Sequence, residues 1–184
     1  MTSLDMFIHM EAVDRKGWSG PPDDRPLTAL GLKQAKRIAD ELGVQPVSAI
    51  FSSPALRCRQ SLEPLAARVG LPVVVLPGFK DTQGYRAPGG WENPERSGGD
   101  PLGGAQSAGS AYAALREIQA RVPEGRAVLC SYGDIVPALL AFLSGSYALD
   151  MPPRNNQKGA TFTVAFDGDR LTMSERPPSA DFPK

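Results

Sequence analysis

The chain has 184 residues, of which 41% are hydrophobic, so it is long enough for one domain with a substantial core. Its 20 Lys and Arg residues balance 20 Asp and Glu residues, which leaves no net field to attract nucleic acid or an anionic membrane. The single histidine excludes a multi-histidine metal site, and two cysteines provide neither a metal cluster nor a disulfide framework. We therefore expect no metal, no cofactor, and neither nucleic acid nor membrane as a partner.

The N-terminal residues do not have the pattern of a secretory signal. Their apolar stretch is short and is interrupted by Asp5 and His9, with no preceding basic region. A bilayer span needs about 20 consecutive apolar residues, and we find no such run. We expect a cytoplasmic protein, and no apolar stripe predicts a particular oligomeric state.

Predicted strands and helices alternate through the first part of the chain. In chain order they are a strand over residues 4–9, a helix between 28 and 43, a strand over 47–51, a helix from 53 to 70 and a strand over 72–76. Thr28 is the expected N-cap of the first helix. Ser53 is the expected N-cap of the second, with Pro54 in its first turn.

Glycine and proline become dense between residues 77 and 105. A loop of this length within a compact domain is usually functional or disordered, so we expect a lid over a site. Beyond it follow a predicted helix over 112–122, an apolar strand over 127–131, a helix over 134–143, and strands over 161–166 and 170–173. Asp167-Gly168-Asp169 predicts a tight hairpin between those strands, and the tail after Ser174 is expected to be extended or frayed.

This alternation predicts a single α/β domain over residues 1–184. Its architecture is expected to be a three-layer α/β/α sandwich with a mostly parallel central sheet and a C-terminal hairpin. In such sheets, ligands bind where strands end and helices begin. Three strand ends therefore carry the candidate site, at His9, at Ser53, and at Tyr132 with Gly133.

Four of these segments, in this order, resemble the histidine phosphatase (phosphoglycerate-mutase-like) superfamily. They cover residues 7–12, 25–31, 51–61 and 128–134, and Lys158-Gly159-Ala160 before the hairpin also fits. The most specific are Leu-Thr-Ala-Leu-Gly at 27–31 and Ser-Ser-Pro-Ala-Leu-Arg-Cys-Arg-Gln at 52–60. The pattern is similar to that of small SixA-like phosphatases and of the phosphatase domain that follows a Nudix domain in some bacterial hydrolases.

The resemblance implies a phosphomonoester hydrolase that needs no cofactor and acts on a small phosphorylated molecule or a phosphoprotein. His9 falls on the nucleophile that becomes transiently phosphorylated, and Arg57 on one of two arginines that hold the phosphoryl oxygens. A loose, anionic transition state needs such donors together with an in-line nucleophile. Ser53 and Gly133 are further candidate substrate contacts. The usual proton donor has no clean counterpart, and Asp81 is the nearest candidate.

The sequence departs from the family pattern inside the expected pocket. Ile8 stands where the first arginine is expected, Tyr132 where a second histidine is expected, and Met10 where a small residue is usual. Losing one preorganised donor commonly costs about two to three orders of magnitude in rate. Glu92 is a second, weaker candidate acid, and Ala105 stands where many relatives have a glutamate.

A substitute cation is therefore of interest. Arg15 is the first candidate because it lies on the loop that leaves the His9 strand, and Arg25, Arg59 and Lys158 are the others. Three hypotheses remain open: a phosphatase with an altered pocket, a pseudoenzyme that binds a ligand or partner without turnover, and a pocket rebuilt for a more apolar ligand or another reaction.

Overall fold

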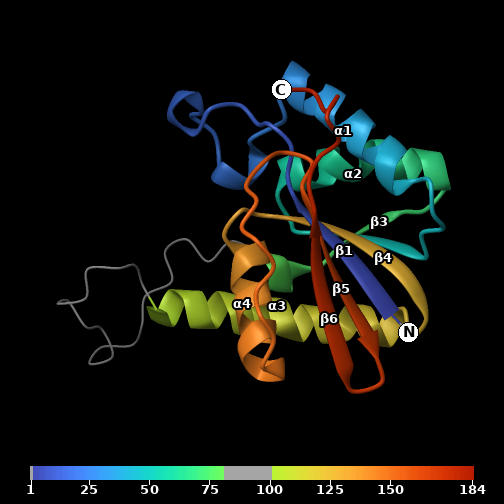
Figure 1. Ribbon diagram of the computed structural model, residues 1–184. Coiled ribbons are helices and arrows are strands. Elements are labelled where there is room, and N and C mark those ends of the chain that lie inside the picture. The colour runs from blue at the N-terminus through green and yellow to red at the C-terminus, as the bar shows by residue number, and fades with distance from the viewer. Residues whose placement is uncertain (1, 81–100) are drawn as a thin grey trace.

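The computed structural model describes residues 2–80 and 101–184, and its centre is one six-stranded sheet in the order β3-β2-β4-β1-β5-β6 (Figure 1). The strands are β1 (Thr2–Ile8), β2 (Ala49–Ser52), β3 (Val73–Val75), β4 (Gly125–Ser131), β5 (Thr161–Asp167) and β6 (Arg170–Arg176). The pairs β1–β4, β4–β2 and β2–β3 are parallel, whereas β1–β5 and β5–β6 are antiparallel. The predicted mostly parallel sheet with a C-terminal hairpin is confirmed.

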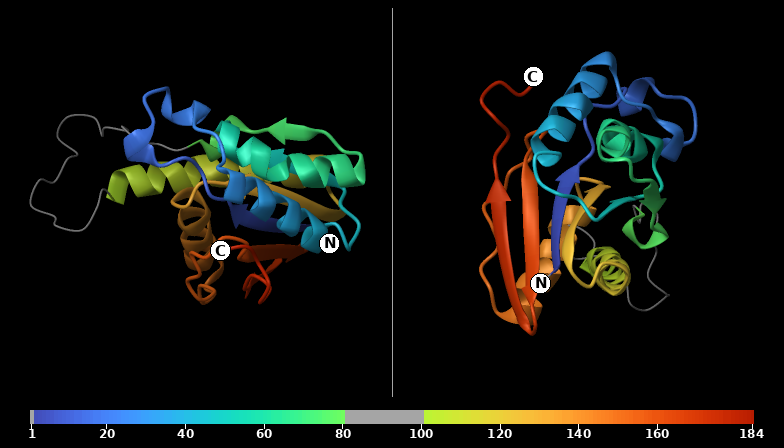
Figure 2. Two further views of the ribbon diagram at one scale, coloured as in Figure 1. Left: turned by 90° about the horizontal axis from the view of Figure 1, so that it is seen from above. Right: turned by 90° about the vertical axis from the view of Figure 1, so that its right-hand side faces the viewer.

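Helices cover both faces of the sheet, which confirms the predicted three layers. They are α1 (Ala29–Leu42), α2 (Leu56–Val69), α3 (Pro101–Arg121) and α4 (Ile135–Tyr147). Helices α1 and α2 pack together on one face, and α3 and α4 lie on the other (Figures 1 and 2). Three short 3-10 helices connect these elements: η1 (Arg15–Gly17), η2 (Pro22–Asp24) and η3 (Pro77–Phe79).

The two predicted N-caps have different outcomes. The Thr28 hydroxyl accepts a hydrogen bond from the Gly31 amide at 3.0 Å, so the cap of α1 is confirmed. Ser53 as the cap of α2 is wrong, because that helix begins at Leu56 with Ala55 as its N-cap and no side-chain cap. The reason is that the Ser53 amide still donates to the Cys130 carbonyl at 3.0 Å, which extends the pairing of β2 with β4. A residue in that ladder cannot also turn into a helix.

The long predicted loop is shorter than expected on its C-terminal side. Helix α3 begins at Pro101 rather than at Tyr112, and residues 81–100 lie outside the described residues. The helix was missed because its first two turns consist mainly of glycine, alanine and serine, which carry no apolar periodicity. Helix α3 packs closely against η3. A Cβ on Gly78 of η3 would lie 2.8 Å from the Ser110 carbonyl oxygen of α3.

Of the two predicted alternatives for the C-terminal tail, extended or frayed, the structure shows an extended tail that is docked on the body of the protein. Phe182 is buried, and its ring fills the space that a Cβ on Gly159 would occupy. The Gln34 side chain of α1 donates to the Pro183 carbonyl at 2.9 Å. These contacts attach the tail to α1 and to the turn before β5.

The first turn of α1 is docked on the segment that follows His9. The Glu11 carbonyl accepts from the Thr28 amide at 3.0 Å, and the Glu11 carboxylate accepts from the Thr28 hydroxyl at 2.8 Å. This close approach requires a glycine at 31, since a Cβ there would lie 1.9 Å from the Glu11 oxygen. The Leu-Thr-x-x-Gly pattern therefore positions the segment that follows His9.

We expect Gly31→Ala to lower the free energy of unfolding by about 3 kcal/mol, because the new methyl group collides with a backbone carbonyl that cannot turn away. Gly145→Ala is the matched control: Gly145 is exposed in α4 with open space at its Cβ position, so this variant should gain about 0.5–1 kcal/mol. Urea unfolding measures both. Equal stabilities of Gly31→Ala and wild type would contradict the packing described.

Candidate functional site

His9 lies directly after β1, and its ring is fixed by a hydrogen bond to its own chain neighbour. Its Nδ1 atom is 2.7 Å from the carbonyl oxygen of Met10. Because a carbonyl oxygen only accepts, Nδ1 must carry the proton, and the lone pair then resides on Nε2. This is the tautomer in which an imidazole acts as a nucleophile through Nε2.

The surroundings of His9 keep the imidazole uncharged. Burial, together with the nearby positive charges of Lys158, Arg57 and Arg25, lowers its pKa from 6.5 to about 3, although the hydrogen bond to the Met10 carbonyl acts in the raising direction. The ring is therefore neutral at pH 7. Three cationic side chains, those of Lys158, Arg57 and Arg25, therefore lie close enough to the neutral His9 ring to lower its pKa.

The backbone of His9 is held on both sides. Its amide donates to the Ser131 carbonyl of β4 at 3.1 Å, and the Lys158 ammonium donates to its carbonyl oxygen at 2.6 Å. Burial lowers the pKa of Lys158 from its ordinary value. Lys158, one of the candidate substitute cations, thus supports the main chain of the nucleophile.

Arg57, in the first turn of α2, is almost completely buried, with 3% of its surface exposed. One Nη1 hydrogen bond goes to the Pro22 carbonyl at 2.8 Å, and its guanidinium carbon lies 4.9 Å from the centre of the Tyr132 ring. Its Nε atom has no hydrogen-bond partner within the structure as described. A buried donor without a hydrogen-bond partner carries a desolvation cost, which makes this side chain a candidate functional group.

Ser61 joins the nucleophile to the arginine helix and was not anticipated as a site residue. Its hydroxyl accepts from the Met10 amide at 3.0 Å and donates to the Arg57 carbonyl at 2.7 Å. Met10 itself is fully buried in the core. The serine at this point of the second signature therefore links the main chain after His9 to the main chain of Arg57.

Tyr132 occupies the predicted position after β4, but its hydroxyl is engaged by the protein. It donates to Asp23 of η2 at 3.1 Å, and the other Asp23 oxygen lies 3.5 Å from the Lys80 ammonium. Burial raises the pKa of Tyr132 above its ordinary value, with the Asp23 charge acting in the same direction. The side chain is neutral at pH 7 and contributes no positive charge.

A small cationic cavity of about 140 Å³ lies against Arg57. Arg15, Arg25 and Arg57 line it, together with Trp18, Gly20, Pro22 and Asp23. Arg25 donates to the Val13 carbonyl at 2.8 Å, and burial and the charges of Arg57 and Arg15 lower its pKa. The structure thus brings the first candidate substitute cation, Arg15, to the same cavity as Arg57.

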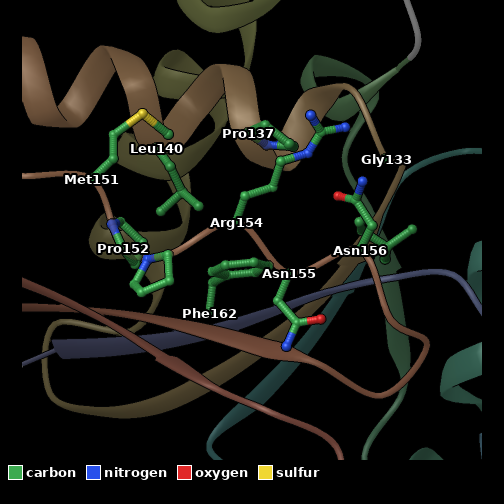
Figure 3. Close-up of a pocket in the computed structure, with 11 residues that line it drawn as sticks. Gly133, Pro137, Leu140, Met151, Pro152, Arg154, Asn155, Asn156 and Phe162 are labelled. Atoms are coloured by element: carbon green, nitrogen blue, oxygen red, sulfur yellow. The ribbon is translucent and has the colours of Figure 1, made fainter.

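Ile8 lies elsewhere, on a larger and mainly apolar groove of about 690 Å³. Its lining is Ile8, Gly133, Pro137, Leu140, Met151, Pro152, Pro153, Arg154, Asn155, Asn156 and Phe162 (Figure 3). The place at which the resemblance expects an arginine therefore presents hydrocarbon to an open groove. Gly133, a predicted substrate contact, lines this groove as well.

Neither of these two cavities is lined by His9, Tyr132, Lys158, Ser53, Arg59 or Ala105. Ser53 is fully buried, and its hydroxyl lies against the Cys58 thiol without an assigned hydrogen bond. Arg59 is exposed on α2, and Ala105 is exposed in α3. Asp81 and Glu92 fall outside the described residues.

The low pKa of His9 predicts a loss of stability at acid pH. Below pH 6.5 the unfolded chain binds a proton at His9, whereas the folded protein does so only near pH 3. The free energy of unfolding of the wild type should therefore fall relative to that of His9→Gln by about 1 kcal/mol per pH unit between these limits. Urea unfolding of both proteins from pH 7 to pH 4 measures this. A difference that is independent of pH would contradict the partly buried, neutral ring.

Comparison with known proteins gives a consistent result. A sequence profile of the histidine phosphatase superfamily (branch 1) matches residues 11–176, beginning just after His9. The mycobacterial glucosyl-3-phosphoglycerate phosphatase Rv2419c has a similar fold, with a TM-score of 0.71, 21% identity, and coverage of 97% of this chain and 99% of its own. For YhfR of Bacillus stearothermophilus the TM-score is 0.70 with 17% identity, covering 94% and 95%.

The protein histidine phosphatase SixA, solved with tungstate, has a TM-score of 0.63 and 19% identity, with 93% of each chain covered. At these identities the structural similarities establish the shared fold. In the ranges 2–80 and 101–184, none of the helices has the length and apolar character of a membrane span.

Proposed function

Because the chain belongs to the histidine phosphatase superfamily, we propose that it is a slow phosphomonoester hydrolase with His9 as its nucleophile. The observation that carries this proposal is the neutral His9 ring with its lone pair on Nε2, within electrostatic reach of a buried Arg57 that has an unpaired Nε donor. These two groups supply the minimum that phosphoryl transfer needs, an in-line nucleophile and a fixed positive charge. The substrate class is a phosphorylated small molecule or phosphoprotein.

The reaction proceeds in two displacements. The Nε2 lone pair forms a bond to phosphorus while the ester P–O bond breaks. The electron pair of the P–O bond leaves with the alcohol oxygen, and this oxygen takes a proton from water or an acid. Water then attacks phosphorus, the P–N bond breaks, and its electron pair returns to Nε2 as inorganic phosphate leaves. Throughout, the hydrogen bond from Nδ1 to the Met10 carbonyl stabilises the positive charge on the phosphorylated ring.

Positive charge near the phosphoryl group comes from fewer and different residues than the family pattern supplies. Arg57 and, from the adjoining cavity, Arg15 and Arg25 are available. Ile8 contributes no donor, and Tyr132 is neutral and already bonded to Asp23. Since one missing donor costs about two to three orders of magnitude in rate, turnover should be slow.

One specific observation favours a second function, binding of a phosphorylated ligand without turnover. The η2 segment accepts hydrogen bonds from two of the candidate site residues: the Pro22 carbonyl accepts from Arg57, and the Asp23 carboxylate accepts from Tyr132. A ligand that displaced this segment would bind the same donors with no requirement for attack by His9. Under this alternative the protein is a pseudoenzyme that recognises phosphate.

Hydrolysis of p-nitrophenyl phosphate distinguishes the hydrolase from the module that binds phosphate without turnover. The p-nitrophenolate leaving group needs no proton donor, so the rate depends only on the nucleophile and the cations. We expect slow turnover by wild type, background rates for His9→Ala, and a loss of about 100-fold for Arg57→Gln. Ile8→Arg combined with Tyr132→His should raise kcat by at least about tenfold.

Arg68→Gln is the matched control, because Arg68 is an exposed arginine of the same helix, paired with Asp40 at 2.9 Å. Its rate should equal that of wild type. Equal background rates for wild type and His9→Ala would refute the hydrolase, and tungstate binding that depends on Arg57 would then support the binding module.

A further inference from the structure

We infer that Asp23 is an internal competitor for the anion site, because η2 occupies with its own oxygen atoms the donors that a phosphorylated molecule would use. The inference rests on the proposed function and adds to it a regulation of the same site. Three oxygen atoms of η2 lie on donors that come from three different parts of the chain. A phosphomonoester also presents three terminal oxygen atoms.

The three contacts of η2 combine one neutral donor with two cations. One carboxylate oxygen of Asp23 accepts from the Tyr132 hydroxyl at 3.1 Å, and the other lies 3.5 Å from the Lys80 ammonium. The Pro22 carbonyl accepts from Nη1 of Arg57 at 2.8 Å. Donors of this kind bind a charged oxyanion more strongly than a neutral acceptor.

The donors belong to one cationic region. The Arg57 guanidinium carbon lies 4.9 Å from the centre of the Tyr132 ring, and Arg57 and Asp23 line the cavity of about 140 Å³ together with Arg15 and Arg25. Burial and the charges of Arg57 and Arg15 lower the pKa of Arg25, so the three guanidinium groups repel one another. Among the described residues, none of the three forms a salt bridge. Such a region attracts an anion, and Asp23 is the acidic side chain on the cavity's lining.

The loop that carries η2 is closed at its base by contacts that do not involve Asp23. Ala12 and Leu27 form an isolated β-bridge, and the Val13 amide donates to the Pro26 carbonyl at 3.0 Å. None of the three residues of η2 is buried. Displacement of η2 therefore costs its own polar contacts and exposes no core side chain of the segment, while the base of the loop stays closed.

This competition lowers the apparent affinity of the site for any anion. Apparent affinity falls in proportion to the fraction of molecules in which the donors are free, so a segment that occupies them about nine-tenths of the time weakens binding about tenfold. A phosphomonoester dianion carries one negative charge more than the carboxylate that it displaces. Asp23 thus favours ligands of higher negative charge over carboxylates.

Calorimetric titration with tungstate tests the inference. Asp23→Asn keeps the shape of the side chain and an acceptor for Tyr132, but it removes the charge. We expect this variant to bind tungstate about tenfold tighter than wild type. Asp24→Asn is the matched control, because it changes the net charge equally at the next, exposed residue of η2, and its affinity should equal that of wild type.

A crystal structure of the wild-type tungstate complex covers the case in which Asp23→Asn does not fold. We expect tungstate oxygen atoms on Arg57 and Tyr132, with the Asp23 carboxylate withdrawn from the Tyr132 hydroxyl. Tungstate bound while Asp23 stays on Tyr132 would overturn the inference. So would an affinity of Asp23→Asn no higher than that of wild type, an equal gain in Asp24→Asn, or no tungstate binding by either protein.

Kinetics with p-nitrophenyl phosphate distinguish a failure of this inference from a failure of the proposed function. If both hold, Asp23→Asn lowers KM about tenfold and leaves kcat unchanged, because η2 competes only in the free enzyme. If the hydrolase proposal fails, no variant turns over, yet the tighter tungstate binding of Asp23→Asn persists. Hydrolysis that depends on His9 but has the same KM in Asp23→Asn and wild type would refute the internal competitor alone.

Discussion

The hydrogen bond from the His9 ring to the Met10 carbonyl is the contact on which the site depends. It fixes the proton on Nδ1 and leaves the Nε2 lone pair available, while burial keeps the ring neutral. Met10 can hold this position because its side chain is in the core and its amide is bonded to Ser61, which is bonded in turn to the Arg57 carbonyl. One short network therefore fixes the tautomer of His9 and connects the main chain beside it to the main chain of Arg57.

The charges around this network have been redistributed rather than removed. Arg57, Arg25 and Lys158 all act on His9, and two of them are occupied in holding backbone carbonyls, Arg25 at Val13 and Lys158 at His9. Tyr132 contributes an aromatic face to Arg57 and a hydrogen bond to Asp23. The neighbouring groove has gained hydrocarbon at Ile8.

The features that the sequence predicted are those encoded by local patterns. The Thr28 cap is specified by residues within one turn, and the strand ends at His9 and Tyr132 follow from short apolar runs. Features built from distant contacts were missed. Tyr132 meets Asp23 across 109 positions, and Gln34 reaches Pro183 across 149, so neither pair has a signature in any local window. The groove beside Ile8 also needs residues from β1, α4 and β5 together, which only the folded chain supplies.

Nitrogen-15 NMR of the imidazole at pH 7 tests the central claim most directly, because the chain contains one histidine and gives one set of ring signals. The account predicts a neutral ring with the proton on Nδ1 and an unprotonated Nε2. A charged ring at pH 7, or a neutral ring with its proton on Nε2, would contradict it.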